Sequence, residues 1–238
     1  MSLGPAEAPV PVMSNASAAG ATARIAVFDL DGTLTWRDTL LPFLGGYLAR
    51  HPWRWPRLWR LPFAVAAFVL RQRDPGVFKS RLIRIVMGGE PRGAIDAWAA
   101  AFVGRLPARR AFRPAALRAI EEHRDAGDHL ILLSASPDLY VPRIGRLLRF
   151  DLSISTEVLW CGDRLDGTLV SANRRGEEKV RCLESLHARY PGIPIVAYGN
   201  SASDIPLLRR ADRAVLVNAH AAARKIARSA GIALADWR

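Results

Sequence analysis

Four short clusters of polar residues stand out in this sequence. They are Asp29-Leu30-Asp31-Gly32-Thr33, Ser134-Ala135-Ser136, the single residue Lys179, and the run from Gly199 to Asp204. Together they contain carboxylates, hydroxyls and one amine. When a phosphoryl group is transferred, the electrophile is an anion, so an attacking carboxylate needs a nearby cation and oriented hydrogen-bond donors. The four clusters hold these groups and indicate phosphoryl-transfer chemistry.

The first cluster pairs two carboxylates, Asp29 and Asp31, at a spacing of two residues. A carboxylate that acts as nucleophile divides the reaction into two easier steps. A second carboxylate nearby can move the proton, first to the leaving group and later from water. Gly32 allows the loop that carries them to turn sharply. The pair therefore has the spacing that a nucleophile and a proton carrier require.

The other clusters offer groups that bind phosphate or metal. The Ser134 hydroxyl and the backbone amides that follow it could hold phosphate oxygens, and Lys179 is a compact positive charge for the same anion. Asp204 could complete a magnesium site with Asp29 and water molecules. Taken singly, each residue has an ordinary explanation as a turn residue, a loop hydroxyl, a solvated charge or a helix cap. Their order along the chain favours a shared function.

The elements that must position these clusters alternate along the chain. Short apolar runs rich in β-branched residues predict strands at 24–28, 129–133, 194–198 and 213–217. Helical patterns follow at 113–127, from about 137, and at 177–189, 202–210 and 220–230, and residues 157–170 form a predicted hairpin. This alternation predicts an α/β fold with a parallel sheet covered by helices on both faces. In such sheets ligands bind beyond the carboxyl ends of the strands, where the clusters lie.

Four motifs carry a resemblance to a known family: FDLDGTLT, LLSAS, GEEKV and AYGNSASDIPLL. Over about residues 24–218 the sequence resembles the haloacid dehalogenase superfamily, subfamily IB, which includes phosphoserine phosphatases and phosphatidylglycerophosphate phosphatases. The resemblance implies a Rossmann-like parallel sheet and an inserted α-helical cap of the C1 type. We therefore expect a core domain at 23–37 and 113–238, a helical cap at 38–112, and a disordered tail at 1–22.

The resemblance also implies a Mg²⁺-dependent phosphatase that forms an aspartyl-phosphate on Asp29, with Asp31 as general acid and base. The residues expected to bind the substrate phosphate are Thr33, Ser134, Ala135 and Lys179. Those expected at the metal are Asp29, Asp31 through its backbone carbonyl, Asn200 and Asp204. The family usually has aspartate where Asn200 stands, so the site has one negative charge fewer. We expect Mg²⁺ to bind more weakly than it would in an Asn200→Asp variant.

The charge balance points to an anionic partner. The chain has 34 Lys and Arg against 22 Asp and Glu, a formal net charge of +12. Phosphorylated small molecules, lipid head groups and nucleic acids would all suit it. The charge is diffuse and no nucleic-acid recognition motif is visible, which argues against nucleic acid. Two isolated cysteines and the lack of a signal peptide or a bilayer-length apolar run predict a cytoplasmic protein.

The expected cap has an unusual composition. Between positions 50 and 84 it holds nine basic residues and one acid, Asp74, with Trp53, Trp55 and Trp59 among the first arginines. These nine are Arg50, Arg54, Arg57, Arg60, Arg71, Arg73, Lys79, Arg81 and Arg84. An ordinary helical cap, with apolar faces packed on each other and on the core, is one interpretation. The other is a surface that lies peripherally on the inner face of the membrane.

Three views of the function follow. A membrane-facing cap favours an anionic phospholipid head group such as phosphatidylglycerophosphate as substrate. A small metabolite such as phosphoserine is the alternative, although Asp38 stands where phosphoserine phosphatases place a glutamate. A catalytically weak member of the fold that only binds its ligand is the third view, and Asn200 is the one residue in its favour.

Overall fold

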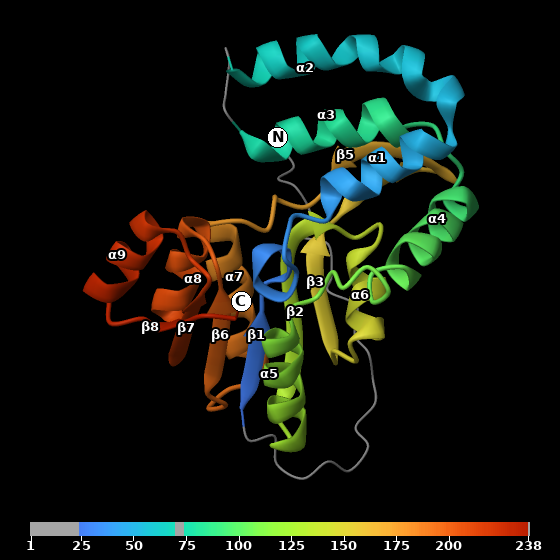
Figure 1. Ribbon diagram of the computed structural model, residues 1–238. Coiled ribbons are helices and arrows are strands. Elements are labelled where there is room, and N and C mark those ends of the chain that lie inside the picture. Colours follow the sequence, from blue (N-terminus) through green and yellow to red (C-terminus); the bar gives the residue numbers. More distant parts are fainter. Residues whose placement is uncertain (1–23, 70–73, 238) are drawn as a thin grey trace, which may run out of the picture.

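Apolar strands form the centre of the protein. The computed structural model describes residues 24–69 and 74–237 (Figure 1). The strands run in parallel in one six-stranded sheet of order β3-β2-β1-β6-β7-β8. Their bounds are β1 Ile25–Phe28, β2 His129–Pro137, β3 Leu152–Thr156, β6 Ile195–Gly199, β7 Arg213–Val217 and β8 Ala233–Ala235. The predicted tail at 1–22 lies outside the described residues.

Alternate side chains of β1 point to opposite faces of the sheet and explain why both faces carry helices. Ile25 and Val27 pack in a cluster with α7 (Glu177–Arg189), α8 (Ile205–Arg210) and α9 (Ala221–Ser229). Ala26 and Phe28 pack on the other face with α5 (Pro114–Asp125) and α6 (Val141–Leu147). All four side chains are fully buried, as expected for a central parallel strand. The predicted fold class is confirmed.

A helical segment is inserted between β1 and α5. It contains α1 (Leu40–Arg50), a 3₁₀ segment (Pro52–Arg60), α2 (Leu61–Ala67), α3 (Pro75–Met87) and α4 (Arg92–Gly104). We call residues 40–104 the insertion. Figure 1 shows it beyond the carboxyl ends of β1 and β2, with α2 outermost and α3 between α2 and the sheet. Within the described residues no helix combines the length and apolarity needed to cross a membrane.

The chain leaves and re-enters the sheet domain at neighbouring points. Thr35, before the insertion, pairs with Phe112, after it, in an isolated antiparallel bridge. The Trp36 amide donates to the Ala111 carbonyl at 3.1 Å and the Arg113 amide to the Leu34 carbonyl at 2.8 Å. The two connecting segments therefore form one short ribbon under the insertion.

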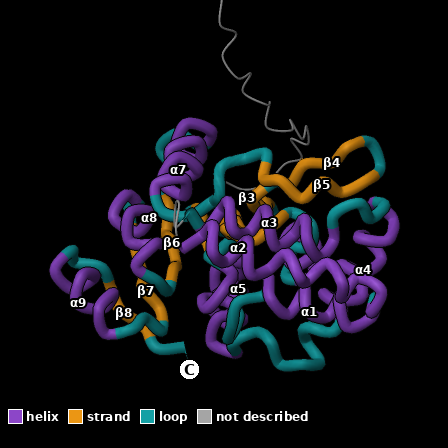
Figure 2. Tube along the Cα trace, turned by 90° about the horizontal axis from the view of Figure 1, so that it is seen from above, coloured by secondary structure: helices purple, strands orange, loops and turns teal. Residues whose placement is uncertain are grey.

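The predicted hairpin forms a separate two-stranded sheet, β4 (Val158–Cys161) and β5 (Arg164–Leu169). The Leu169 amide donates to Ser80 Oγ in α3 at 3.1 Å, and the Gly89 amide donates to the Leu165 carbonyl at 2.7 Å. Figure 2 shows this hairpin next to the insertion, seen from above. The hairpin thus ties the sheet domain to α3.

Some predicted boundaries were wrong. Strand β2 continues past Leu133 to Pro137, which pairs with Thr156 of β3, and the next helix begins only at Val141. Two short strands at the sheet edges, β3 and β8, were not predicted. Sequence 202–210 divides into a 3₁₀ turn, Ala202–Asp204, and the helix α8.

Candidate active site

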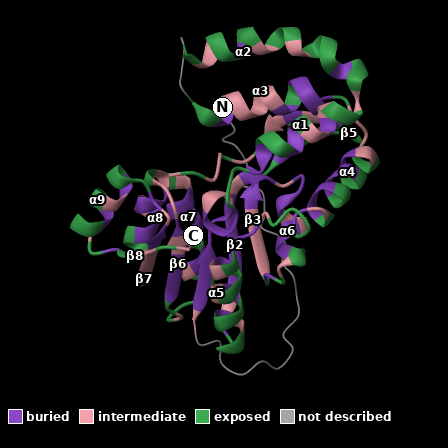
Figure 3. Ribbon diagram, viewed as in Figure 1, coloured by how far each residue is buried: buried purple, intermediate pink, exposed green. Residues whose placement is uncertain are grey.

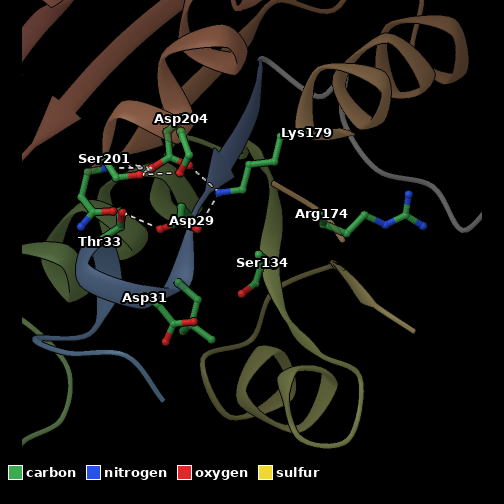
Figure 4. A network of polar contacts seen from close by, with 12 residues as sticks. Asp29, Asp31, Thr33, Ser134, Arg174, Lys179, Ser201 and Asp204 are labelled. Atoms are coloured by element: carbon green, nitrogen blue, oxygen red, sulfur yellow. Dashed lines mark hydrogen bonds and ion pairs between the residues drawn. The ribbon is translucent and has the colours of Figure 1, made fainter. Parts of the chain in front are cut away.

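The predicted site residues gather at the carboxyl ends of β1, β2 and β6 (Figure 4). Asp29 follows β1 directly, and Ser134 lies in the last part of β2. Asp204 ends the 3₁₀ turn after β6, and Lys179 lies in the first turn of α7. Parallel pairing of β1 with both β2 and β6 brings segments from three parts of the chain to this edge.

Lys179 bridges the two carboxylates that the sequence analysis placed at the metal. Its Nζ donates to Asp29 Oδ1 at 2.6 Å and to Asp204 Oδ1 at 2.7 Å. Asp29 is 6 % exposed, and Lys179 and Asp204 are each 2 % exposed. Asp29 Oδ2 accepts a further hydrogen bond from Thr33 Oγ1 at 2.9 Å. Two negative charges and one positive charge therefore lie together out of water, which leaves one negative charge over.

Burial and mutual charge shift the pKa values of this trio. Burial raises the pKa of Asp29 to about 7, Lys179 opposes this rise, and the neighbouring Asp204 carboxylate adds to it. Burial alone would lower the pKa of Lys179, but the two carboxylates outweigh it, so the pKa is raised. Burial works to raise the pKa of Asp204, yet Lys179 and Ser201 lower it overall. Lys179 therefore stays protonated and Asp204 ionised, while Asp29 is the group of the three whose charge is most easily lost.

Asp204 also caps the turn in which it lies. Its Oδ2 accepts from the Asn200 amide at 3.2 Å, from the Ser201 amide at 3.0 Å and from Ser201 Oγ at 2.8 Å. A Cβ on Gly199 would lie 2.5 Å from Asp204 Cβ, so only glycine allows this approach. The helix-cap explanation of Asp204 thus holds, and it leaves Oδ1 directed at Lys179.

Asp31 is held apart from this trio. Figure 4 shows its side chain on the far side of Asp29 from Lys179. Its Oδ1 accepts from the Thr39 amide at 2.8 Å and from Thr39 Oγ1 at 2.7 Å, and its Oδ2 accepts from Ser136 Oγ at 2.5 Å. Thr39 Oγ1 also lies 2.9 Å from the Tyr140 hydroxyl. Burial, aided by the nearby Asp38 carboxylate, raises the pKa of Asp31. A carboxyl with a raised pKa is suited to carry a proton.

Ser134 and Ala135 lie in the last part of β2, and the Ala135 carbonyl contacts Lys79 of the insertion. Ser134 is fully buried, and its Oγ accepts from the Ser136 amide at 3.1 Å. The Ala135 carbonyl accepts from Thr156 Oγ1 at 2.8 Å. Its backbone is thereby fixed, and the Ser134 hydroxyl hydrogen remains available to an incoming oxygen.

Lys79 is a site residue that the sequence analysis named only as part of the basic stretch. It comes from α3 of the insertion, and its Nζ donates to the Ala135 carbonyl and, at 2.8 Å, to Asn173 Oδ1. Burial lowers its pKa to about 8, although the Asp31 and Asp38 carboxylates oppose this. No local pattern marks Lys79, because its partners are 56 and 94 residues away in the chain. Near Asp31, Ser136 was named only as a member of the second cluster, and Thr39 and Tyr140 were not named. Ser136 is 105 residues from Asp31 and Tyr140 is 101 residues from Thr39, whereas Thr39 is eight residues from Asp31.

The donor set fits Mg²⁺. Within residues 24–69 and 74–237 no group of three or more His, Cys, Asp or Glu side chains could hold a metal on its own. Asp29 and Asp204 face one another across Lys179, and the remaining ligands would be oxygen atoms of Asn200, of the Asp31 backbone, of water and of the substrate. Mg²⁺ favours this combination of few carboxylates and several waters. The Asn200 side chain lies against the loop of the first cluster, because a Cβ on Gly32 would lie 2.1 Å from its Nδ2.

Comparisons with known proteins bear on the family and the fold. The family model for haloacid dehalogenase-like hydrolases matches residues 26–209. The protein CicA of Caulobacter vibrioides is 34% identical over 191 residues, which cover 79% of this chain and 83% of CicA. Phosphoserine phosphatase SerB1 of Mycobacterium tuberculosis is 25% identical over 220 residues, which cover 90% of this chain and 70% of SerB1.

Two solved structures share the fold. A Bordetella pertussis protein of unknown function has a TM-score of 0.76 and 22% identity, with 91% of this chain and 100% of that chain covered. A phosphoserine phosphatase in the form of a phospho-aspartyl intermediate analogue has a TM-score of 0.62 and 14% identity, with 91% and 94% covered. At such identities the likeness concerns the fold alone.

Proposed function

The chain belongs to the haloacid dehalogenase-like hydrolase family, and we propose that it is a Mg²⁺-dependent phosphatase that forms an aspartyl-phosphate on Asp29. The observation that carries the proposal is the double contact of Lys179 with Asp29 and Asp204 at the strand ends. It places a buried cation beside a carboxylate that can attack phosphorus. The relative named as a phosphoserine phosphatase supports the same reaction class.

The first step uses Asp29 and Asp31 in turn. A carboxylate oxygen of Asp29 attacks phosphorus, and the bond between phosphorus and the leaving oxygen breaks. The Asp31 carboxyl gives its proton to that oxygen, so the alcohol leaves neutral. The raised pKa of Asp31 suits this donation, because the acid must hold its proton until the bond breaks. Thr39 and Ser136 keep its carboxyl group in position.

The second step reverses the proton transfer. The Asp31 carboxylate takes a proton from water, whose oxygen attacks phosphorus and releases phosphate and the free Asp29 carboxylate. The Ser134 hydroxyl, the Ala135 amide, Thr33 and Lys179 would hold the phosphate oxygens throughout. When bound, Mg²⁺ would offset the negative charge of the phosphate, held by Asp29, Asp204, Asn200 and the Asp31 carbonyl.

For the substrate we favour an anionic phospholipid head group such as phosphatidylglycerophosphate, in keeping with the resemblance to the phosphatidylglycerophosphate phosphatase branch and with the basic, tryptophan-rich insertion. Asp38, which stands where phosphoserine phosphatases have a glutamate, accepts from the Leu40 and Leu41 amides at 2.9 and 3.2 Å. It is therefore engaged at the start of α1 and is less free to bind an amino group. Phosphoserine is the alternative that the similarity to SerB1 favours.

The test is phosphate release from p-nitrophenyl phosphate with Mg²⁺, measured for the wild type and for Asp29→Asn. We expect activity in the wild type, its loss with EDTA, and a decrease of about 10³-fold or more in the variant, because the nucleophile is gone. Retained activity in Asp29→Asn would refute the aspartyl-phosphate. Higher kcat/KM for phosphoserine than for phosphatidylglycerophosphate would decide for the alternative substrate.

A further inference from the structure

The outermost part of the insertion exposes large apolar side chains. We call residues 52–69 the outer layer: the 3₁₀ segment Pro52–Arg60, α2 and the two residues that follow it. Figure 3 shows α2 coloured mostly as exposed, while the strands below are buried. The exposed fractions are 69 % for Trp53, 58 % for Trp55, 63 % for Trp59, 66 % for Phe63, 46 % for Val65 and 56 % for Val69.

This exposure is unusual for such a sequence. Residues 61–69 (LPFAVAAFV) contain no polar side chain, and a helix that is apolar all round is normally covered on every side. Among residues 24–69 and 74–237, only the inner side of α2 is covered: Ala64 is buried, and the Phe68 ring lies 5.0 Å from the ring of Phe78 in α3. The interpretation as an ordinary packed cap therefore holds for one side of α2. The other side exposes Phe63 and Val65, and the Phe63 ring lies 5.7 Å from the exposed ring of Trp59. Exposed apolar side chains grouped in this way mark an interaction site.

The charge of the outer layer identifies its partner. From position 40 to 69 the sequence has no Asp or Glu. Arg54 turns inward, where it donates to the Val86 carbonyl at 2.6 Å and pairs with Glu90. Arg57 and Arg60 are both exposed, but Arg57 Nη1 donates to the Gly88 carbonyl at 2.7 Å, whereas the Arg60 guanidinium lies 5.6 Å from the Trp59 ring. A second copy of this layer would bring like charges together, whereas an anionic bilayer supplies both apolar depth and negative charge.

We propose that the outer layer docks on the surface of an anionic lipid bilayer. Trp53, Trp59 and Phe63 enter the interface between head groups and acyl chains, where tryptophan is favoured. Arg60 contacts the lipid phosphates, as basic residues do on amphipathic helices that lie in the plane of the membrane. Since α2 packs on α3, the helix that carries Lys79, one helix pair would face lipid on its outside and the candidate active site on its inside. The lipid substrate rests on the proposed function, but docking itself requires no catalysis.

The test is co-sedimentation of the full chain with vesicles of phosphatidylcholine alone or mixed with phosphatidylglycerol. We expect binding to the mixed vesicles and little to the neutral ones. Trp59→Ser with Phe63→Ser should weaken that binding by about tenfold or more, because each side chain loses its transfer from water. Arg60→Gln should weaken it by about fivefold and reduce its dependence on salt.

Ile226→Ser is the matched control, since Ile226 is 41 % exposed on α9, outside the insertion. It should bind vesicles like the wild type, and all variants should hydrolyse p-nitrophenyl phosphate at the wild-type rate.

Failure of the wild type to bind mixed vesicles, or equal binding by the Trp59 and Phe63 variant, would overturn the proposal. So would a dimer that this variant abolishes in the absence of lipid. Vesicle binding without phosphatase activity would leave docking intact and refute the proposed function instead.

Discussion

The candidate active site and the outer layer differ in where their charged side chains lie: those of the site are buried and paired, whereas the outer layer exposes charge beside apolar side chains. At the site, Lys179 and the two carboxylates beside it are at most 6 % exposed, and both carboxylates pair with the one ammonium group. In the outer layer, Trp53, Trp59 and Arg60 are exposed. A buried charge is tolerated only when it is paired, and at the site the pairing groups come from the chain itself. The exposed apolar surface of the outer layer is explained by something outside the chain.

The largest effect that tests this contrast is expected from Lys179→Met. Removal of the amine leaves Asp29 and Asp204 facing each other in a buried site, which should lower the free energy of unfolding by about 3–5 kcal/mol. Phosphatase activity should be lost as well. Lys225→Met, on the exposed surface of α9, is the control and should stay within about 0.5 kcal/mol of the wild type. Urea denaturation of both variants measures the difference, and equal stabilities would contradict the contrast.

Lys79 lies in α3, the helix on which α2 of the outer layer packs, and it contacts the candidate active site at Ala135. We expect its substitution to lower kcat/KM. Loss of a hydrogen bond from a charged group predicts a decrease in kcat/KM of about 10- to 100-fold in Lys79→Met. Because the pKa of Lys79 is lowered to about 8, kcat/KM of the wild type should decrease as the pH rises above that value. Lys79→Arg stays charged and should flatten this limb of the pH profile. An unchanged profile in Lys79→Arg would assign the decrease to another group.

Unfolding does not account for such a decrease. A lysine whose pKa is lower in the folded state than the ordinary 10.5 destabilises the fold while it is protonated. Its contribution to stability therefore improves as the pH rises through about 8. Thermal denaturation in parallel with the kinetics separates the two effects.

A smaller effect is expected from Asn200→Asp. The substitution adds one carboxylate to a donor set with two, and we expect Mg²⁺ to bind roughly tenfold more tightly because ligand charge governs affinity for hard cations. Isothermal titration with Mg²⁺ measures this directly. Affinity equal to that of the wild type would show that residue 200 is not a metal ligand.

The smallest effect concerns tryptophans of the outer layer. Trp53→Ala with Trp59→Ala should change the free energy of unfolding by about 0.5 kcal/mol or less, since both side chains are exposed. Trp98 is buried and donates from Nε1 to the Phe43 carbonyl at 3.2 Å. Its replacement by alanine should lower the free energy of unfolding by about 3–5 kcal/mol. A large decrease in the free energy of unfolding of the Trp53 and Trp59 variant would mean that the outer layer stabilises the fold and does not serve to bind a partner.

Local patterns were enough to predict the centre of the molecule. Strand β1 is a continuous apolar run, and Asp29, Lys179 and Asp204 each lie in a short local motif that can be recognised without knowledge of distant contacts. The prediction failed where structure depends on distant contacts. Ser136 reaches Asp31 only because β2 pairs with β1, and the two residues are 105 apart in the chain. Edge strands such as β8 are short, so their pattern is weak. The roles of the site residues and the division into domains stay predictions.

The ribbon that joins Thr35 to Phe112 has an evolutionary consequence. Because the chain leaves and returns at paired positions, the segment between them can change in length or content without moving Asp29. Sites where the two ends lie close together tolerate inserted domains. A lineage could therefore exchange what surrounds the leaving group while it inherits the phosphate chemistry unchanged, and new substrates could arise by replacement of one contiguous stretch of gene.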